Sequence, residues 1–335
     1  MKVALVHDDL VQWGGAERML LGLCEIYPDA PLFTSVYDRD NLILQHHFGT
    51  KKIITSFLQK ISGWRSLYKI LLPFYPIAFE QFVFDEYDLV ISSTSRFAKS
   101  IVTKPRTIHI CYTHTPPRFL WHFSQKPKFN LGEVYMNILR FHDQVFGRRV
   151  DYFIASSENA KRRIKRVYRK DADVVYPFVD LERFKDVETF DGGYFVVVGR
   201  SSKYKRFDLA IEACSKIGVD LKMISGKFSD EIVVKILAGC KALIIPGVED
   251  FGIVSLEAQA LGKPVIAFRQ GGAVETVDEG RNGIFFEEAT AEALAEVLTH
   301  FSSNHFNTGT IKKGAEKFSK ENFIKNFKQA VASIV

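Results

Sequence analysis

The chain has 335 residues, which indicates two domains at roughly 150 residues each. Hydrophobic residues make up 47% of the chain and charged residues 25%, values that are ordinary for globular proteins and exclude disordered and fibrous classes. The net charge of +6 favours an anionic partner such as a nucleotide, a phospholipid headgroup or a nucleic acid.

Strand-like and helix-like segments alternate along the first half, a pattern typical of parallel α/β domains. A buried strand is predicted over residues 2–7, and a helix that begins at Gly14-Gly15 runs to about Tyr27. Further strands are predicted over residues 32–37, 89–92, 107–112, 152–155 and 173–176. Residues 177–180 break the pattern, so we expect a first domain over residues 1–178.

The second half repeats the alternation. Strands are predicted over residues 194–199, 221–224, 242–245 and 264–268, and helices over residues 207–217, 254–261 and 291–301. We expect a second domain over residues 190–315 and a C-terminal helix over residues 316–335 that packs back toward the first domain. Two Rossmann-like, doubly wound domains are thus expected to face each other across a cleft, with ligands beyond the carboxyl ends of the strands.

Two motifs of the first half follow predicted strands. Gly14 and Gly15 let a ligand approach the backbone, and the helix N-terminus after them favours an anion. A tight turn without a ligand is the alternative. His114 follows another predicted strand, where its imidazole can bond a hydroxyl or a phosphate. A structural histidine is the alternative, and we interpret His7 and His109 in that way.

A basic cluster follows the strand at residues 194–199. It contains Arg200, Lys203, Lys205 and Arg206. Arginine binds phosphate through two parallel hydrogen bonds and lysine binds it as a point charge, so the cluster suits a diphosphate. Solvated loop charges are the alternative.

Glu249 and Glu257 lie eight positions apart in the second half. The helix dipole alone would explain an acid at the position of Glu249. Glu257 lies on a helix that looks buried, where a carboxylate needs a partner such as sugar hydroxyls. The pair does not indicate a retaining glycosidase, because eight residues of helix rise about 12 Å and such enzymes hold their carboxyl groups about 5–5.5 Å apart.

Other features bear on metals, compartment and membranes. The Asp171–Asp173 pair is interpreted as surface, so no metal is expected. Four separated cysteines indicate reduced thiols, and no signal peptide or membrane span is recognised, so a cytoplasmic protein is expected. No nucleic-acid-binding motif accompanies the charge.

Two segments raise the question of a lipid surface. Apolar spacing over residues 57–84, with Lys60, Arg65 and Lys69 interleaved, predicts an amphipathic helix that breaks at Pro73 and Pro76. This face either packs on the domain or docks on a bilayer. A basic helix over residues 161–170 is either solvated or contacts anionic lipid.

Taken in order, these motifs make the chain resemble the family 4 retaining glycosyltransferases of the GT-B fold, especially bacterial mannosyltransferase-like members. The resemblance covers nearly the whole chain. It is carried by His7-Asp8, Gly14 to Arg18, His114-Thr115-Pro116, Ala155 to Asn159, Gly199-Arg200 with Lys205-Arg206, Glu249-x7-Glu257 and Gly271 to Glu275.

The resemblance implies a role for each matching residue. Backbone amides of Gly14 and Gly15 would face the donor diphosphate. Arg200 and Lys205 would hold that diphosphate and neutralise the leaving nucleotide. His114 would bond the donor sugar and orient it. The family generally needs no metal, because arginine and lysine replace the cation.

The resemblance also implies roles for the residues of the Glu249-x7-Glu257 motif. Glu249 would approach the donor sugar, whose hydroxyls would contact the backbone amides of Phe251, Gly252 and Ile253. Glu257 would bind the ribose hydroxyls of the nucleotide.

The resemblance implies a retaining hexosyltransferase, with GDP-mannose as the favoured donor and a glycan hydroxyl, lipid-linked, as the acceptor. The setting would be cell-envelope polysaccharide or glycolipid synthesis at the inner face of the cytoplasmic membrane. One departure is that the chain after Ser225 looks short by about one βα unit, near the place of the nucleotide base in relatives. A catalytically weak nucleotide-sugar-binding scaffold and a sugar phosphorylase are the alternatives.

Overall fold

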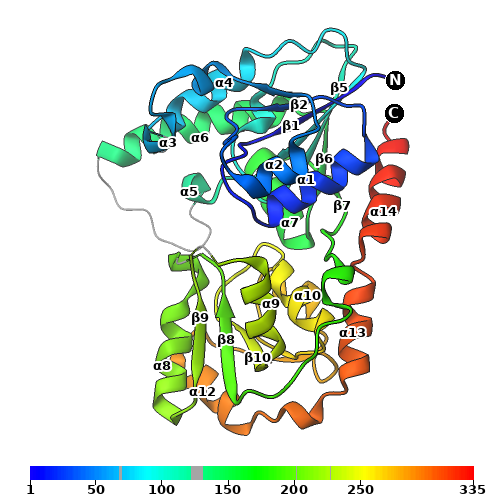
Figure 1. The fold of residues 1–335 in the computed structure, drawn as a ribbon. Coiled ribbons are helices and arrows are strands. Elements are labelled where there is room, and N and C mark those ends of the chain that lie inside the picture. Colours follow the sequence, from blue (N-terminus) through cyan, green and yellow to red (C-terminus); the bar gives the residue numbers. More distant parts are fainter. Residues whose placement is uncertain (68–69, 122–130, 201, 227) are drawn as a thin grey trace. The chain divides into compact units, whose positions relative to one another are not determined.

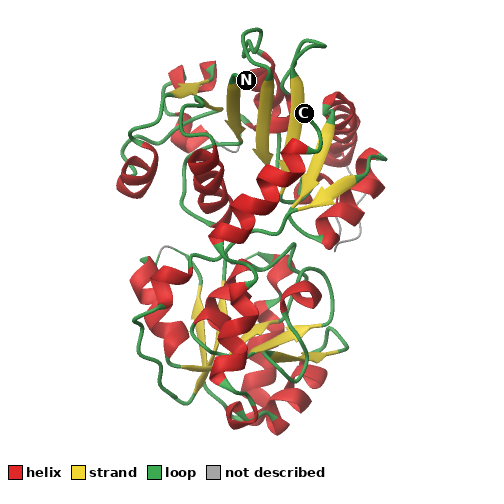
Figure 2. Ribbon diagram, turned by 90° about the vertical axis from the view of Figure 1, so that its right-hand side faces the viewer, coloured by secondary structure: helices red, strands yellow, loops and turns green. Residues whose placement is uncertain are grey.

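A computed structural model describes residues 1–67, 70–121, 131–200, 202–226 and 228–335. The chain forms two compact units, residues 1–176 with 323–335 (unit 1) and residues 177–322 (unit 2) (Figure 1). Each unit is built on a parallel sheet with helices on both of its faces (Figure 2). The predicted fold class of two doubly wound α/β domains is therefore confirmed.

The sheet of unit 1 has seven parallel strands in the order β3-β2-β1-β4-β5-β6-β7. Its strands are β1 (Val3–His7), β2 (Leu32–Thr34), β3 (Ile53–Thr55), β4 (Leu89–Thr94), β5 (Ile108–Thr113), β6 (Tyr152–Ala155) and β7 (Ala172–Val174). His7 pairs with Ser93, and Thr94 with Thr113. The carboxyl ends of β1, β4 and β5 therefore meet at one edge of the sheet.

Unit 1 contains helices of the first half of the chain and the C-terminal helix. They are α1 (Gly15–Ile26), α2 (Leu42–Phe48), α3 (Trp64–Leu67), α4 (Tyr75–Glu80), α5 (Arg118–Trp121), α6 (Leu131–Arg149), α7 (Glu158–Tyr168) and α14 (Lys320–Ala332). The buried rings of Phe323 and Phe327 on α14 lie 6.1 and 5.9 Å from the ring of Tyr112 on β5. These contacts fix the C-terminal helix on unit 1. Among the described residues, no helix has the length and apolar character that crossing a bilayer requires.

The sheet of unit 2 has five parallel strands in the order β12-β11-β10-β8-β9. Its strands are β8 (Tyr194–Val198), β9 (Leu221–Ile224), β10 (Cys240–Ile245), β11 (Val265–Phe268) and β12 (Gly283–Phe286). Its helices are α8 (Phe207–Ile217), α9 (Asp230–Ala238), α10 (Ile253–Ala260), α11 (Ala273–Thr276), α12 (Ala291–His300) and α13 (Thr308–Glu316). The order is the flavodoxin-like 2-1-3-4-5 arrangement. The loss of a βα unit relative to relatives stays a prediction.

The single amphipathic helix predicted over residues 57–84 is wrong. The segment folds into η1 (Phe57–Lys60), α3, η2 (Leu72–Phe74) and α4, and residues 68–69 with Lys69 lie outside the described residues. Pro76 sits in the first turn of α4, where a missing N–H costs nothing, and so begins a helix instead of breaking one. The segment is amphipathic in the folded unit: Leu58, Trp64, Tyr75 and Phe79 are core, and Phe57, Ile70, Phe74 and Ile77 are exposed.

The basic helix is not solvated along its whole length. Arg163 on α7 is buried and donates a hydrogen bond from Nη1 to Thr115 Oγ1 at 3.0 Å. Arg162, Lys165 and Arg166 on the same helix are exposed. One cation of the predicted lipid-facing set is therefore structural.

Buried histidines should make the stability of unit 1 pH-dependent. Burial lowers the pKa of His7 to about 4 and that of His109 to about 3. Both side chains titrate near 6.5 when unfolded, so their contribution is complete above about pH 6.5 and is lost as the pH falls toward the folded pKa. Between roughly pH 6 and 4, the free energy of unfolding should fall by about 1.4 kcal/mol per pH unit for each histidine.

The fluorescence of Trp13, Trp64 and Trp121, which all lie in unit 1, follows this unfolding in urea. The variant His109→Gln keeps a polar side chain that does not titrate. Its free energy of unfolding should therefore fall less steeply with decreasing pH, by the contribution of one proton. An identical slope in the two proteins would contradict the assignment.

Close packing beside Gly272 should make that position intolerant of a side chain. A Cβ atom there would lie 2.3 Å from Phe251 Cα and 2.6 Å from the carbonyl oxygen of Asp250. Alanine tolerates the backbone angles, since φ is -71°, so the cost is steric. We expect Gly272→Ala to lower the stability of unit 2 by about 1–3 kcal/mol, seen as a lower midpoint of thermal unfolding.

Gly309 on α13 is the matched control. Its Cβ would meet only Asn307 Oδ1, at 3.2 Å, and alanine favours a helix, so Gly309→Ala should be neutral or slightly stabilising. Equal midpoints for the two variants would show that the close approach at Gly272 is unimportant.

Candidate functional site

The predicted site residues of unit 2 gather at the carboxyl edge of its sheet. Arg200 follows β8, Glu249 follows β10, and Glu257 lies on the helix after Glu249. All five strands are parallel, so these loops lie at the same edge. Arg200 is exposed, whereas Glu249 and Glu257 are buried.

Lys205 and Glu249 form a nearly buried ion pair. Lys205 Nζ lies 2.5 Å from Glu249 Oε1, and the two side chains are 14% and 11% exposed. Two glycines permit this approach. Gly199 has φ +145° and packs against the lysine stem, while a Cβ on Gly247 would lie 2.0 Å from the carbonyl oxygen of Tyr204. The ammonium is thereby fixed beside the end of the sheet.

The loop between β10 and α10 is held by the turn after β11. The Gly272 N–H donates to the Glu249 carbonyl oxygen at 2.9 Å, and Glu249 and Gly271 form a parallel bridge. Gly252 adopts φ +89° as the N-cap of α10 and supplies no side-chain cap. The helix N-terminus at Gly252 and Ile253 therefore presents its positive end to this edge, while the buried ring of Phe251 packs 5.6 Å from that of Phe318.

Glu257 has a partner that the sequence did not reveal. Arg183 Nη1 lies 3.4 Å from Glu257 Oε1, across 74 residues of sequence. Arg183 belongs to η4 (Leu181–Phe184), in the stretch that the sequence marked only as a break between domains. A lone arginine after such a break carries no signal, so its role was not foreseeable.

In unit 1, Gly14 and Gly15 form the start of α1 directly after β1. Gly14 is the N-cap in an extended conformation, and it provides no side-chain hydrogen bond to the first turn. A twelve-residue helix with such an N-terminus favours an anion. The turn and the anion site remain compatible interpretations of these glycines.

His114 also lies at the carboxyl edge of the unit 1 sheet. The imidazole Nε2 of His114 is 3.1 Å from Ser93 Oγ. The backbone N–H of His114 donates to the Thr94 carbonyl oxygen at 2.9 Å. The half-buried imidazole is thus held through Nε2 by a buried serine that the sequence did not single out. His7 and His109 are buried.

Buried acids shape the same edge. Asp8 accepts hydrogen bonds from Thr94 Oγ1 and the Ser95 N–H, both at 2.7 Å, and Asp9 pairs with Arg96 at 2.5 Å. Burial raises the pKa of Asp8, but the Arg96 charge and these hydrogen bonds hold it below its ordinary value. The ionised Asp8 therefore fixes the turn that carries Arg96.

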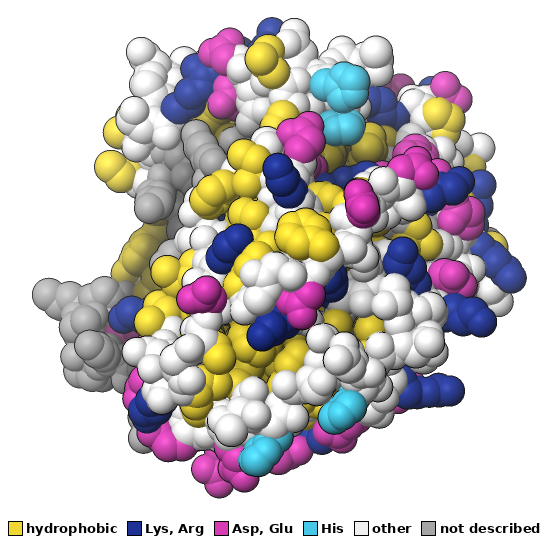
Figure 3. Space-filling view, turned by 60° about the horizontal axis from the view of Figure 1, so that its bottom comes forward, with side chains coloured by type: hydrophobic (Ala, Val, Ile, Leu, Met, Phe, Trp, Pro, Cys, Tyr) yellow, Lys and Arg dark blue, Asp and Glu magenta, His cyan; other side chains and the backbone are white. Residues whose placement is uncertain are grey.

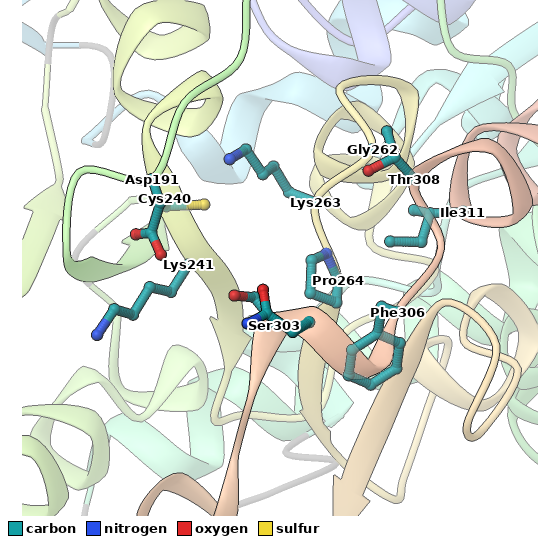
Figure 4. A pocket seen from close by; sticks show the side chains of 11 residues that line it. Asp191, Cys240, Lys241, Gly262, Lys263, Pro264, Ser303, Phe306, Thr308 and Ile311 are labelled. Carbon is teal, nitrogen blue, oxygen red and sulfur yellow. The ribbon is translucent and has the colours of Figure 1, made fainter.

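A cavity of about 320 Å³ lies in unit 2 away from these residues (Figure 4). It is at the amino-terminal edge of the sheet, where Cys240 begins β10 and Pro264 precedes β11. Lys263 on its wall donates to the Phe190 carbonyl oxygen at 2.7 Å, and burial lowers the pKa of that lysine. None of the predicted site residues lines this cavity.

Charges of both signs are spread over the described surface. On the face shown in Figure 3, acidic and basic side chains are interspersed, so the net charge does not form one basic patch there. Within the described ranges, no three histidine, cysteine or carboxylate side chains gather as metal ligands. Asp171 and Asp173 are exposed, and Lys165 pairs with Asp171 at 2.7 Å.

Part of the chain is similar to known glycosyltransferases. Residues 218–322 match the family of glycosyl transferases group 1, a range that contains Glu249, Glu257 and Gly272. An uncharacterized glycosyltransferase of Methanocaldococcus jannaschii is 27% identical over 195 residues, which is 51% of this chain and 55% of that protein. The chain thus spans about half the length of that relative.

Two further proteins are similar over nearly the whole chain. The alpha-1,3/1,6-mannosyltransferase ALG2 of Saccharomyces cerevisiae is 22% identical over 99% of this chain and 85% of its own length. The structure of HepE of Anabaena in complex with UDP-glucose has a TM-score of 0.69 at 18% identity, covering 99% of this chain and 100% of that one. The chain therefore has the GT-B fold, and its residues 218–322 are similar to glycosyl transferases group 1.

Proposed function

We propose that this protein is a retaining glycosyltransferase that moves a hexose from a nucleotide diphosphate sugar to a glycan hydroxyl. The observation that carries the proposal is the carboxyl edge of unit 2. There the Lys205 ammonium, the N-terminus of α10 and the buried Glu257 carboxylate of the same helix lie in segments that follow neighbouring strands. This combination suits a ligand with a diphosphate at one end and hydroxyl groups beside it.

Cations at this edge would hold the diphosphate. Arg200 is exposed beyond β8, and Lys205 is fixed by Glu249 at 2.5 Å. The ammonium of Lys205 would then contact both Glu249 and the bound diphosphate, and the guanidinium of Arg200 would contact the diphosphate as well. We propose that these two cations do the work of a metal ion, by stabilising the charge that develops on the leaving nucleotide.

The remaining residues would orient the donor. Glu257 would accept hydrogen bonds from the ribose hydroxyls, and Glu249 with the amides of Phe251, Gly252 and Ile253 would contact the donor sugar. In unit 1, the amides of Gly14 and Gly15 would face the diphosphate, and His114, held by Ser93, would bond the sugar.

The reaction we propose is a front-face substitution. The bond between the anomeric carbon and the phosphate oxygen breaks, while the acceptor oxygen forms its bond on the same face of the sugar. The leaving phosphate takes the acceptor proton. Because the new bond forms on the face from which the phosphate leaves, the configuration at the anomeric carbon is retained. Positioning and charge stabilisation would supply the catalysis.

The relatives point to the identity of the donor. Similarity to the mannosyltransferase ALG2 supports mannose, with GDP-mannose as the donor. The complex of HepE with UDP-glucose makes UDP-glucose the rival donor. For the acceptor we propose a lipid-linked glycan of envelope or glycolipid synthesis at the inner face of the cytoplasmic membrane. Exposed apolar side chains such as Phe74 and Ile77, and basic ones on α7, support contact with anionic lipid.

A panel of GDP- and UDP-sugars tests the donor. A bound donor stabilises the folded protein by mass action, so GDP-mannose should raise the midpoint of thermal unfolding. Transfer to a glycan acceptor should continue in EDTA, and NMR of the product should show the anomeric configuration of the donor.

Two other outcomes would contradict the assignment of a glycosyltransferase. Stabilisation without any transfer would indicate a binding scaffold. Glycoside cleavage that requires inorganic phosphate would indicate a sugar phosphorylase.

Loss of the exposed cation should damage turnover. We expect Arg200→Ala to lower kcat about 100-fold or more, because one donor to a developing negative charge is removed. The midpoint of thermal unfolding should stay unchanged. Lys203→Ala removes an exposed cation from the same loop and should leave kcat within about twofold of wild type. Wild-type turnover in Arg200→Ala would refute the assigned role.

A further inference from the structure

Arg183 joins two acidic side chains on different helices of unit 2. Its Nη1 lies 3.4 Å from Glu257 Oε1 on α10, and its Nη2 lies 3.1 Å from Asp230 Oδ2 in the first turn of α9. The Arg183 side chain is 25% exposed, Glu257 12% and Asp230 45%. The guanidinium therefore spans the gap between the start of α9 and the middle of α10.

The backbone that carries Arg183 is fixed independently of this contact. Phe184, the next residue, is buried, and the Arg183 Cζ lies 5.2 Å from its ring centre. Upstream, the buried Val179 donates its N–H to the carbonyl oxygen of Phe318 at 2.9 Å. Because η4 is held by these contacts and packs against α10, the backbone of Arg183 is fixed relative to Glu257.

A carboxylate as buried as that of Glu257 needs a cation or hydrogen-bond donors, since an unpaired buried charge is costly. A planar guanidinium holds such a group in one orientation better than an ammonium does, because its donors form a rigid fork. A carboxylate has about four acceptor positions on two oxygens, so the contact with Arg183 leaves it capacity for further donors. Those donors would be a pair of adjacent hydroxyls.

We infer that Arg183 is a positioning residue for nucleotide recognition, which acts through Glu257 by orienting its carboxylate toward the two ribose hydroxyls. The inference rests on the proposed role of Glu257 in the transferase. Asp230 holds the other arm of the guanidinium, so the start of α9 takes part in setting the orientation.

The ratio of two affinities tests this role. Titration calorimetry would compare GDP and UDP with their 2′,3′-dideoxy forms in the full-length protein. Hydrogen bonds to a charged group should make the wild type bind the ribose form about tenfold or more tightly than the dideoxy form. Glu257→Gln should reduce this ratio to below about threefold. Arg183→Met, which keeps the apolar stem over Phe184, should reduce it equally, and the double variant should show no further loss.

Lys185→Met is the matched control, because Lys185 follows η4, is exposed and pairs only loosely with Glu182 at 3.7 Å. Its ratio should equal that of the wild type. If Arg183 has only a structural role, Arg183→Met would weaken the binding of the ribose and dideoxy forms alike and leave their affinity ratio unchanged. That result would overturn the role of Arg183 but not that of Glu257. A wild type that binds neither nucleotide, or that binds ribose and dideoxy forms equally, would overturn the proposed role of Glu257 as well.

Discussion

The parallel direction of every strand is the constraint on which the candidate site depends. In each unit, all strands run the same way, so each loop that follows a strand emerges at one edge. This alone brings Arg200, Glu249 and Gly271 together in unit 2, although they are separated by up to 71 residues (271 − 200). It likewise places Gly14 and His114 at one edge of unit 1. The chemistry of each site is therefore set by loop residues on a scaffold of buried strands.

Close approach of backbone segments shapes the edge of unit 2. Gly199 and Gly247 allow η5 (Lys203–Lys205) to lie against the strand ends, and Gly272 allows the turn after β11 to touch the loop at residues 249–251. The ion pair of Lys205 and Glu249 then forms with little exposure to water. A preorganised cation of this kind needs little rearrangement when a negatively charged group arrives.

Local patterns in the sequence were sufficient for the long buried strands and for the loops that follow them. The apolar run at β8 and the glycine after it predicted both the strand and its basic loop. Strands β3 and β12 were missed, although β2 and β9, which are equally short, were predicted. Helix α6 was missed, and the segment at residues 57–84 was wrongly joined, because tertiary packing decides where such segments turn. Arg183 and Ser93 act through contacts 74 and 21 residues away, which no local pattern encodes.

The central claim is that the carboxyl edge of unit 2 binds the nucleotide diphosphate of a sugar donor. A crystal structure of the protein with GDP-mannose, or with GDP if the sugar is lost, tests this most directly. We expect the diphosphate to lie between Arg200 and Lys205 at the N-terminus of α10, with the ribose hydroxyls on Glu257. A nucleotide bound instead in the cavity at the amino-terminal edge, between Cys240 and Lys263, would contradict it.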